Sequence, residues 1–145
     1  MSIVHPRLPG ARVVDLFAGT GALGLEALSR GAAHCDFVEH SARVAKVLRD
    51  NIATLGAGER ATVHVMDSLS FVARCTDGAF DIGFADPPWR KGYAERVAEL
   101  WLERPFATVL GVEHETAAPM PDGGETRRYG DTGITIYHRQ TEGPP

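Results

Sequence analysis

Cysteine is scarce in this sequence, and that scarcity excludes several kinds of structure. Cys35 and Cys75 are its only two cysteines, and they have neither CxxC spacing nor a nearby pattern of His and Cys. A disulfide framework or a zinc site is therefore not expected, and two buried free thiols are. The six histidines show no HxxxH or HExxH spacing, so no metal cofactor is expected either.

Long apolar runs are also missing. Charged residues or glycine interrupt every apolar stretch within about ten residues, whereas a membrane-spanning helix needs roughly 20. The opening residues MSIVHPRLPG lack the basic start and apolar core of a secretory signal. A chain of 145 residues that is 43% hydrophobic can bury one core but not two. We expect a single domain over residues 1–145 that is cytoplasmic, monomeric and not associated with a membrane.

An excess of basic residues is the third thing the sequence lacks. Its formal net charge is −4, whereas a protein that binds a polyanion usually presents a basic surface. The overall charge counts against binding of nucleic acid. Whether the protein binds nucleic acid must therefore be judged from where its basic residues lie.

Short apolar runs and segments with helical spacing alternate along the chain, which predicts an α/β fold with a mostly parallel sheet and right-handed crossovers. Two closing strands over 125–139, around Asp131 and Thr132, predict an antiparallel hairpin, for seven strands in all. On the second helix, Val44, Val47, Leu48, Ile52 and Leu55 are expected to share one face. The predicted strands before the hairpin are 12–17, 34–39, 61–66, 80–85 and 107–114, and the predicted helices are 22–31, 43–55, 68–75 and 93–103.

The segment DLFAGTGALG (15–24) has glycines at 19, 21 and 24, at a predicted junction of strand and helix. Glycines there allow backbone amides and a helix N-terminus to approach a ligand. The spacing GxGxxG also fits a dinucleotide-binding turn, and Glu39 ends the second strand, where an acid would bind ribose hydroxyls. By itself the turn leaves a nicotinamide-dependent oxidoreductase open.

Asp15 favours a different ligand, because it places an acid within a strand that is normally apolar in dinucleotide-binding proteins. A carboxylate suits S-adenosylmethionine, which carries an ammonium and a sulfonium and has no pyrophosphate. Asp15, Glu39, Asp67 and Asp86 are all predicted at the carboxyl ends of strands, the edge where open α/β sheets bind ligands. Each has a simpler alternative: a turn carboxylate for Asp15, a solvated strand end for Glu39, and a helix cap for Asp67 with Ser68.

The tetrapeptide Asp86-Pro87-Pro88-Trp89 follows the fourth predicted strand. Two consecutive prolines fix the backbone and donate no amide hydrogen. The Asp86 carboxylate and the Pro87 carbonyl can accept the N–H groups of an exocyclic amine on a base, and Trp89 can stack on that base. A turn with an aromatic staple is the alternative, but combined with the glycine-rich turn the motif predicts methyl transfer to a nitrogen.

These residues together resemble the RsmD family. The resemblance is carried by VVDLFAGTGALGLEALSRGA (13–32), FVE (37–39), FADPPWRKG (84–92) and RRYGDTGITIY (127–137), and it spans nearly the whole chain. It implies a Rossmann-like class I methyltransferase with helices on both faces of the sheet. It also implies S-adenosylmethionine as cofactor and the N2 amine of a guanine in small-subunit (16S) ribosomal RNA as target, with ribosomal RNA or the small subunit as partner.

The resemblance also assigns roles to residues. It places Asp15 and the backbone of Phe17, Ala18, Gly19, Thr20 and Gly21 around the methionine part of the cofactor, Glu39 with His40 at its ribose, and Asp67 with Ser68 at its adenine. Asp86, Pro87, Pro88 and Trp89 would receive the guanine. Trp89 stands where the family usually has Tyr or Phe, which preserves stacking.

Two features of the resemblance concern RNA. Members of the family normally carry a basic segment and a helix before the first strand, and we expect that segment to be absent here. The remaining basic pairs, Arg90 with Lys91 and Arg127 with Arg128, could contact phosphates or simply be solvated. Two alternatives stay open: a cofactor-binding module that is inactive alone, and a methyltransferase acting on adenine in DNA or on a protein glutamine.

Overall fold

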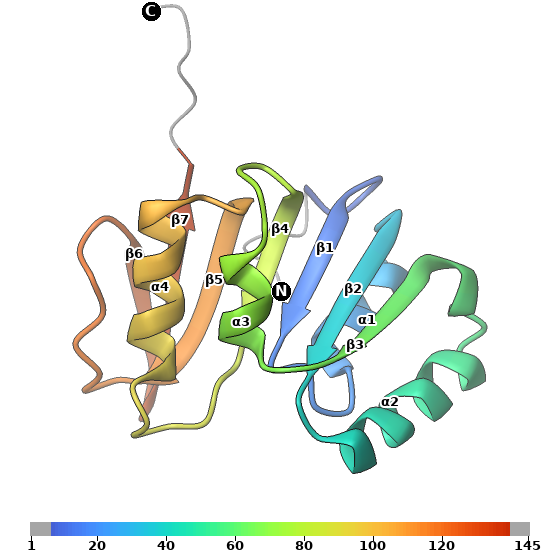
Figure 1. The fold of residues 1–145 in the computed structure, drawn as a ribbon. Coiled ribbons are helices and arrows are strands. Elements are labelled where there is room, and N and C mark those ends of the chain that lie inside the picture. The colour runs from blue at the N-terminus through green and yellow to red at the C-terminus, as the bar shows by residue number, and fades with distance from the viewer. Residues whose placement is uncertain (1–6, 140–145) are drawn as a thin grey trace, which may run out of the picture.

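A computed structural model describes residues 7–139 of the chain. Strands and helices alternate as the sequence predicts, up to a closing pair of strands (Figure 1). The strands are β1 (Arg12–Leu16), β2 (His34–Glu39), β3 (Ala61–Val65), β4 (Phe80–Ala85), β5 (Ala107–Glu115), β6 (Glu125–Tyr129) and β7 (Thr132–His138). The helices are α1 (Ala22–Ser29), α2 (Ala42–Thr54), α3 (Ser68–Ala73) and α4 (Tyr93–Glu103), with a 3-10 turn, η2 (Gly58–Arg60), before β3.

The strands form one seven-stranded sheet in the order β3-β2-β1-β4-β5-β7-β6. Strands β1 to β5 pair in parallel, whereas β7 pairs antiparallel with both β5 and β6. The predicted α/β class, the mostly parallel sheet and the antiparallel hairpin are confirmed. The strand order reverses between β1 and β4, and ligands of open α/β sheets bind at the carboxyl ends of the strands beside such a reversal.

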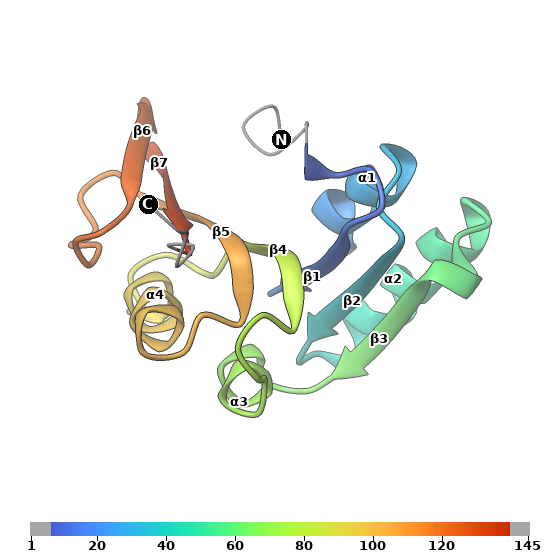
Figure 2. The same ribbon diagram turned by 90° about the horizontal axis from the view of Figure 1, so that it is seen from above.

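Helices cover both faces of this sheet, because alternate residues of each buried strand point to opposite sides. Figure 2 shows α1 and α2 on one face and α3 and α4 on the other. Val13 and Phe37 belong to the apolar core under α1 and α2. Val14 and Leu110 belong to the core under α3 and α4, where the indole N–H of Trp101 donates to the carbonyl of Ala107 at 2.8 Å.

The prediction for the face of α2 was right for Leu48 and Ile52, which are buried, and wrong for Val47 and Leu55, which are 45% and 63% exposed. The buried stripe is completed by Ala45. Those three positions follow the spacing of a narrow apolar stripe, and the small Ala45 is easily overlooked beside larger side chains. Ser41 caps the helix as predicted, since its hydroxyl accepts from the N–H of Val44 at 3.2 Å.

Smaller differences between prediction and structure concern the ends of β1 and α3 and the burial of one cysteine thiol. Strand β1 ends one residue earlier than predicted, because Phe17 adopts a left-handed conformation with φ of 55°. Helix α3 ends at Ala73, two residues before its predicted end. Both cysteines are free, but Cys35 is buried whereas Cys75 is only partly buried.

No helix within residues 7–139 is long and apolar enough to cross a membrane. Over the same residues, the structure gathers no group of three His, Cys, Asp or Glu side chains that could hold a metal ion.

Candidate functional site

The glycine-rich turn between β1 and α1 is built from backbone conformations that favour glycine. Gly19 and Gly21 have φ of 58° and 92°, and Gly21 is the N-cap of α1. Phe17 also has a positive φ, which is unusual for a residue with a bulky side chain. Its backbone N–H donates to the Ser68 hydroxyl at 3.0 Å, so the first residue of α3 holds the turn in this conformation.

Gly24 serves helix packing. A side chain at this position would collide with the ring of Phe37 and the thiol of Cys35, both on β2. The third glycine of the GxGxxG spacing therefore allows α1 to lie close against the sheet, while the first two shape the turn.

Glu39 at the end of β2 connects the turn to the neighbouring strand. Its Oε1 accepts from the N–H of Gly19 at 3.0 Å, and its Oε2 accepts from the N–H of Ser41 at 2.8 Å. The side chain is nearly buried, whereas that of His40 is 77% exposed and lies 3.3 Å from the Glu39 carboxylate. An ionised carboxylate accepts about four hydrogen bonds, so Glu39 keeps acceptor capacity for a ligand.

Asp15 lies beneath the turn. Its side chain is 2% exposed, and its Oδ2 accepts from the N–H of Gly24 at 3.0 Å. Burial raises the pKa of Asp15 to about 8; the hydrogen bond from Gly24 opposes this rise, and the charges of Asp86 and Glu39 add to it. The structure thus gives Asp15 a role in bracing the turn, and its contact with a cofactor stays a prediction.

Asp67 and Ser68 begin α3. Asp67 is the N-cap, and its carboxylate accepts from the N–H and the hydroxyl of Ser70 at 2.8 and 3.0 Å. The helix-cap alternative is therefore correct as a description of what Asp67 contacts within the chain. Both residues also line a cavity, so capping does not remove them from the site.

Two adjoining cavities open at the carboxyl ends of β1, β2 and β4. The larger, of about 400 Å³, lies between the end of β2 and the DPPW corner (Asp86–Trp89). The smaller, of about 170 Å³, reaches the start of α3. Phe17, His40 and Pro88 line both cavities; Glu39, Asp86, Pro87 and Trp89 complete the larger one, and Asp67, Ser68 and Tyr93 complete the smaller one.

Most predicted cofactor and acceptor residues are thus brought together. Ala18, Gly19, Thr20 and Gly21 form the adjacent turn and, like Asp15 beneath it, do not line these two cavities. The site is rich in acids, which suits a ligand carrying an ammonium and a sulfonium and disfavours a pyrophosphate. This charge counts against the nicotinamide-dependent alternative.

Tyr93 was missed by the sequence analysis, which treated it only as the start of a helix. Its ring lies 5.7 Å from that of Phe17, centroid to centroid, and closes the smaller cavity. Its aromatic character and its position four residues after Trp89 were the signal that could have identified it.

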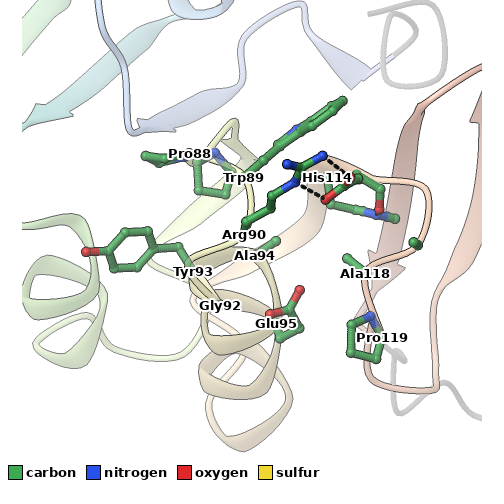
Figure 3. Close-up of a pocket in the computed structure, with 13 residues that line it drawn as sticks. Pro88, Trp89, Arg90, Gly92, Tyr93, Ala94, Glu95, His114, Ala118 and Pro119 are labelled. Atoms are coloured by element: carbon green, nitrogen blue, oxygen red, sulfur yellow. Dashed lines mark hydrogen bonds and ion pairs between the residues drawn. The ribbon is translucent and has the colours of Figure 1, made fainter.

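The DPPW corner has a further cavity, of about 320 Å³, on the side of α4 (Figure 3). Pro87, Pro88, Trp89 and Tyr93 thus lie between the cofactor-side cavities and this third one. Trp89 is 39% exposed. The remaining walls are the segment that leads into α4, the start of α4, the end of β5 and the loop after it, namely Arg90, Gly92, Ala94, Glu95, His114, Glu115, Ala117, Ala118 and Pro119.

Arg90 reaches across this third cavity. Its Nη2 and Nε lie 3.1 and 3.4 Å from the two oxygens of Glu115, as the dashed lines in Figure 3 mark. The Arg90 side chain is nevertheless 78% exposed. Lys91, the next residue, is exposed as well. Arg90 therefore lies at the mouth of the third cavity, whereas Lys91 lines none of the three cavities.

Arg127 and Arg128 lie on β6, the edge strand of the sheet, where every residue is exposed. Arg127 is 3.6 Å from the carboxylate of Glu125. The two arginines do not line the three cavities. Strand β6 ends at the same edge of the sheet as the site, because Tyr129 pairs with Thr132 and Thr132 pairs with Glu115 of β5.

Glu113 is a second residue that the sequence analysis missed. In the register of β4 and β5, Ala85 pairs with Val112, so Asp86 and Glu113 follow side by side. Burial, and after it the charge of the neighbouring Asp86, raise the pKa of Glu113. An acid within an otherwise apolar strand was the available signal, as it was for Asp15.

Comparison with known proteins agrees with this geometry. A ribosomal RNA small subunit methyltransferase D of Escherichia coli is 35% identical over 147 residues, covering 95% of this chain and 73% of its own length. A conserved hypothetical protein from Streptococcus pyogenes superposes with a TM-score of 0.81 at 26% identity, covering 99% and 96% of the two chains. An RNA methyltransferase from Salinibacter ruber, solved with S-adenosyl-L-homocysteine, shares the fold at a TM-score of 0.70, 14% identity, and coverage of 99% and 95%.

The fold and the relatives together define a Rossmann-like, S-adenosylmethionine-dependent methyltransferase. A family model described as "Conserved hypothetical protein 95" matches residues 1–138. The chain therefore belongs to this family, and the resemblance to the RsmD family is confirmed.

Proposed function

We propose that the protein transfers a methyl group from S-adenosylmethionine to the exocyclic N2 of a guanine in small-subunit ribosomal RNA. The observation that carries this proposal is the position of the DPPW corner: Asp86, Pro87, Pro88 and Trp89 line the larger cavity beside the residues predicted to hold the cofactor. The relative from E. coli, named as a small-subunit ribosomal RNA methyltransferase, supports the RNA class of substrate.

Residues on the cofactor side would hold a cation that carries a reactive methyl group. S-adenosylmethionine supplies that methyl on a positively charged sulfur. Glu39 has acceptor capacity for the ribose hydroxyls, and Asp67 and Ser68 lie in the part of the cavity that would receive the adenine. Phe17 and Tyr93 add apolar walls to the same space.

The acceptor side would orient an amine. The Asp86 carboxylate and the Pro87 carbonyl accept its N–H groups, which aims the nitrogen lone pair toward the methyl carbon while Trp89 stacks on the base. A bond forms between N2 and the methyl carbon as the sulfur–carbon bond breaks and its electron pair returns to sulfur. The amine then loses one proton, which Asp86 can accept and pass to solvent.

Phosphate contacts of the RNA are proposed for Arg90, Lys91, Arg127 and Arg128. All four are exposed: Arg90 lines the third cavity, Lys91 follows it in the chain, and Arg127 and Arg128 lie on the edge strand β6. Binding that rests on four cations is expected to be weak and salt-dependent, with a slope of log affinity against log salt of about −3.

The test is methylation of small ribosomal subunits and of their free RNA with labelled S-adenosylmethionine, followed by mass spectrometry of the nucleosides. The proposal expects N2-methylguanosine. Methylated adenine in DNA or methylated protein glutamine would overturn the target, and folded protein that binds the cofactor but methylates none of these would favour the inactive module.

Two variants sharpen the test. Asp86→Ala should lower the methylation rate by about 100-fold or more, with cofactor affinity changed far less. Trp89→Ala should lower it by roughly 10- to 100-fold through lost stacking, and Trp89→Phe by less. The control is Glu59→Gln, an exposed residue in η2 before β3, which should leave the rate unchanged.

A further inference from the structure

Glu113 stands beside the residue that would hold the reacting amine. The pairing of Ala85 with Val112 places the next residues, Asp86 and Glu113, on neighbouring strands, and such strands lie about 4.8 Å apart. Ala85 and Val112 both point into the core under α3 and α4. By the alternation of a strand, Asp86 and Glu113 therefore both point to the opposite face.

The two carboxyl groups differ in exposure and influence each other electrostatically. Asp86 is exposed and Glu113 is partly buried, and the charge of Asp86 adds to the effect of burial in raising the pKa of Glu113. Two carboxylates at this distance repel each other unless a donor lies between or beside them. The pair is therefore suited to a ligand that presents two neighbouring N–H groups.

Guanine presents such a pair, because its N1–H lies next to its 2-amino group. Adenine has a lone pair at N1, as does 2-aminopurine, which nevertheless keeps the 2-amino group. A carboxylate that faces N1 accepts a hydrogen bond from guanine and meets a lone pair in the other two bases. Sites built around such a polar contact reject analogues that cannot make it.

We propose that Glu113 is a specificity-determining residue that accepts the N1–H of the target guanine while Asp86 accepts an N–H of its 2-amino group. This assignment rests on the proposed function. The two neighbouring strand ends then have separate roles. Asp86, after β4, accepts from the reacting nitrogen, and Glu113, on β5, accepts from the group that distinguishes guanine from other bases.

The experiment compares two substrates that differ at the target nucleotide only. Once the methylated guanosine has been mapped, splinted ligation introduces guanosine or 2-aminopurine riboside at that position of the ribosomal RNA, and the RNA is assembled into subunits. Single-turnover methylation rates are measured for the wild type, Glu113→Gln and the control Glu59→Gln. Calorimetry with S-adenosylmethionine verifies that each protein is folded and binds cofactor.

Glutamine keeps the size of the side chain, and its amide can donate to the N1 lone pair of 2-aminopurine as well as accept from guanine. The wild type and Glu59→Gln should prefer guanosine by at least about tenfold, and Glu113→Gln should reduce that preference by about tenfold or more with unchanged cofactor affinity.

Equal loss of rate on both substrates would overturn the assignment and make Glu113 a residue that only positions Asp86. An unchanged preference would overturn it as well. In either case methylation of guanosine by the wild type would leave the proposed function standing, whereas a wild type that methylates no guanosine would overturn both proposals.

Discussion

The backbone N–H of Phe17 donates to the Ser68 hydroxyl at 3.0 Å, which fastens the turn after β1 to the start of α3. These two residues are 51 positions apart in the sequence, and both line the smaller cofactor-side cavity. A single hydrogen bond therefore couples the conformation of the glycine-rich turn to the wall that would receive the adenine.

Ser68→Ala should test this coupling. The substitution leaves the N–H of Phe17 without its acceptor in a left-handed conformation, so we expect a loss of roughly 1–3 kcal/mol in the free energy of unfolding. Cofactor affinity should fall several-fold, as measured by calorimetry. Ser29→Ala removes only an exposed hydroxyl that donates to the Glu26 carbonyl and should cost no more than about 0.5 kcal/mol. Equal losses in the two variants would contradict the coupling.

Asp15→Asn should make stability less dependent on pH. Burial raises the pKa of Asp15 from 3.8 to about 8, so between these values the folded protein holds a proton that the unfolded chain releases. Stability of the wild type is therefore favoured below pH 4 and declines as the pH rises toward 8. The variant cannot ionise and should be more stable than the wild type at pH 8 by on the order of 1–3 kcal/mol.

Urea unfolding of both proteins at pH 5 and at pH 8 measures this difference, which should shrink at the lower pH. Asp50→Asn, an exposed position on α2, is the control and should show no such trend. We also expect Asp15→Asn to weaken cofactor binding more at pH 8 than at pH 5, because the Asp15 carboxyl carries a negative charge near the cation only as the pH approaches its raised pKa. A variant that is stabilised and yet binds cofactor normally would assign Asp15 a purely structural role.

Gly24→Ala should destabilise the fold. The added methyl group would collide with Phe37 and Cys35 beneath α1, and overpacking of this kind costs about 1–3 kcal/mol. Gly58→Ala is a matched control, because nothing lies within 4 Å of a side chain at that position. Thermal and urea unfolding distinguish the two. Equal stabilities would show that α1 shifts without cost.

Arg127 and Arg128 should contribute to RNA affinity through their charge. Replacing both with Ala should reduce the slope of log affinity against log salt by about 1–2, with little dependence on RNA sequence. Arg43 and Arg49 on α2 are exposed and provide a control of equal charge. Filter binding of small-subunit RNA over a range of salt concentrations measures both. If the slope of log affinity against log salt changes equally in the two double variants, Arg127 and Arg128 make no specific contact with the RNA.

The sequence alone determined the element order and predicted the chemistry of the candidate site. Alternating apolar runs predicted the α/β fold because the periods of strands and helices differ, and the positions of Glu39 and Asp86 followed from the rule that ligands bind at the carboxyl ends of parallel strands. Local spacing also predicted the turn at Gly19 and Gly21, since left-handed conformations favour glycine there.

Only the tertiary structure decided which distant residues meet. The register of β4 and β5 placed Glu113 beside Asp86, and the position of α4 brought Tyr93 to the ring of Phe17. The degree of burial of individual side chains was also decided by packing. Asp15 is buried, which raises its pKa, whereas Val47 of α2 is exposed. These outcomes depend on how helices and strands pack against each other. The residue spacing within one segment does not predict which distant segment will pack against it.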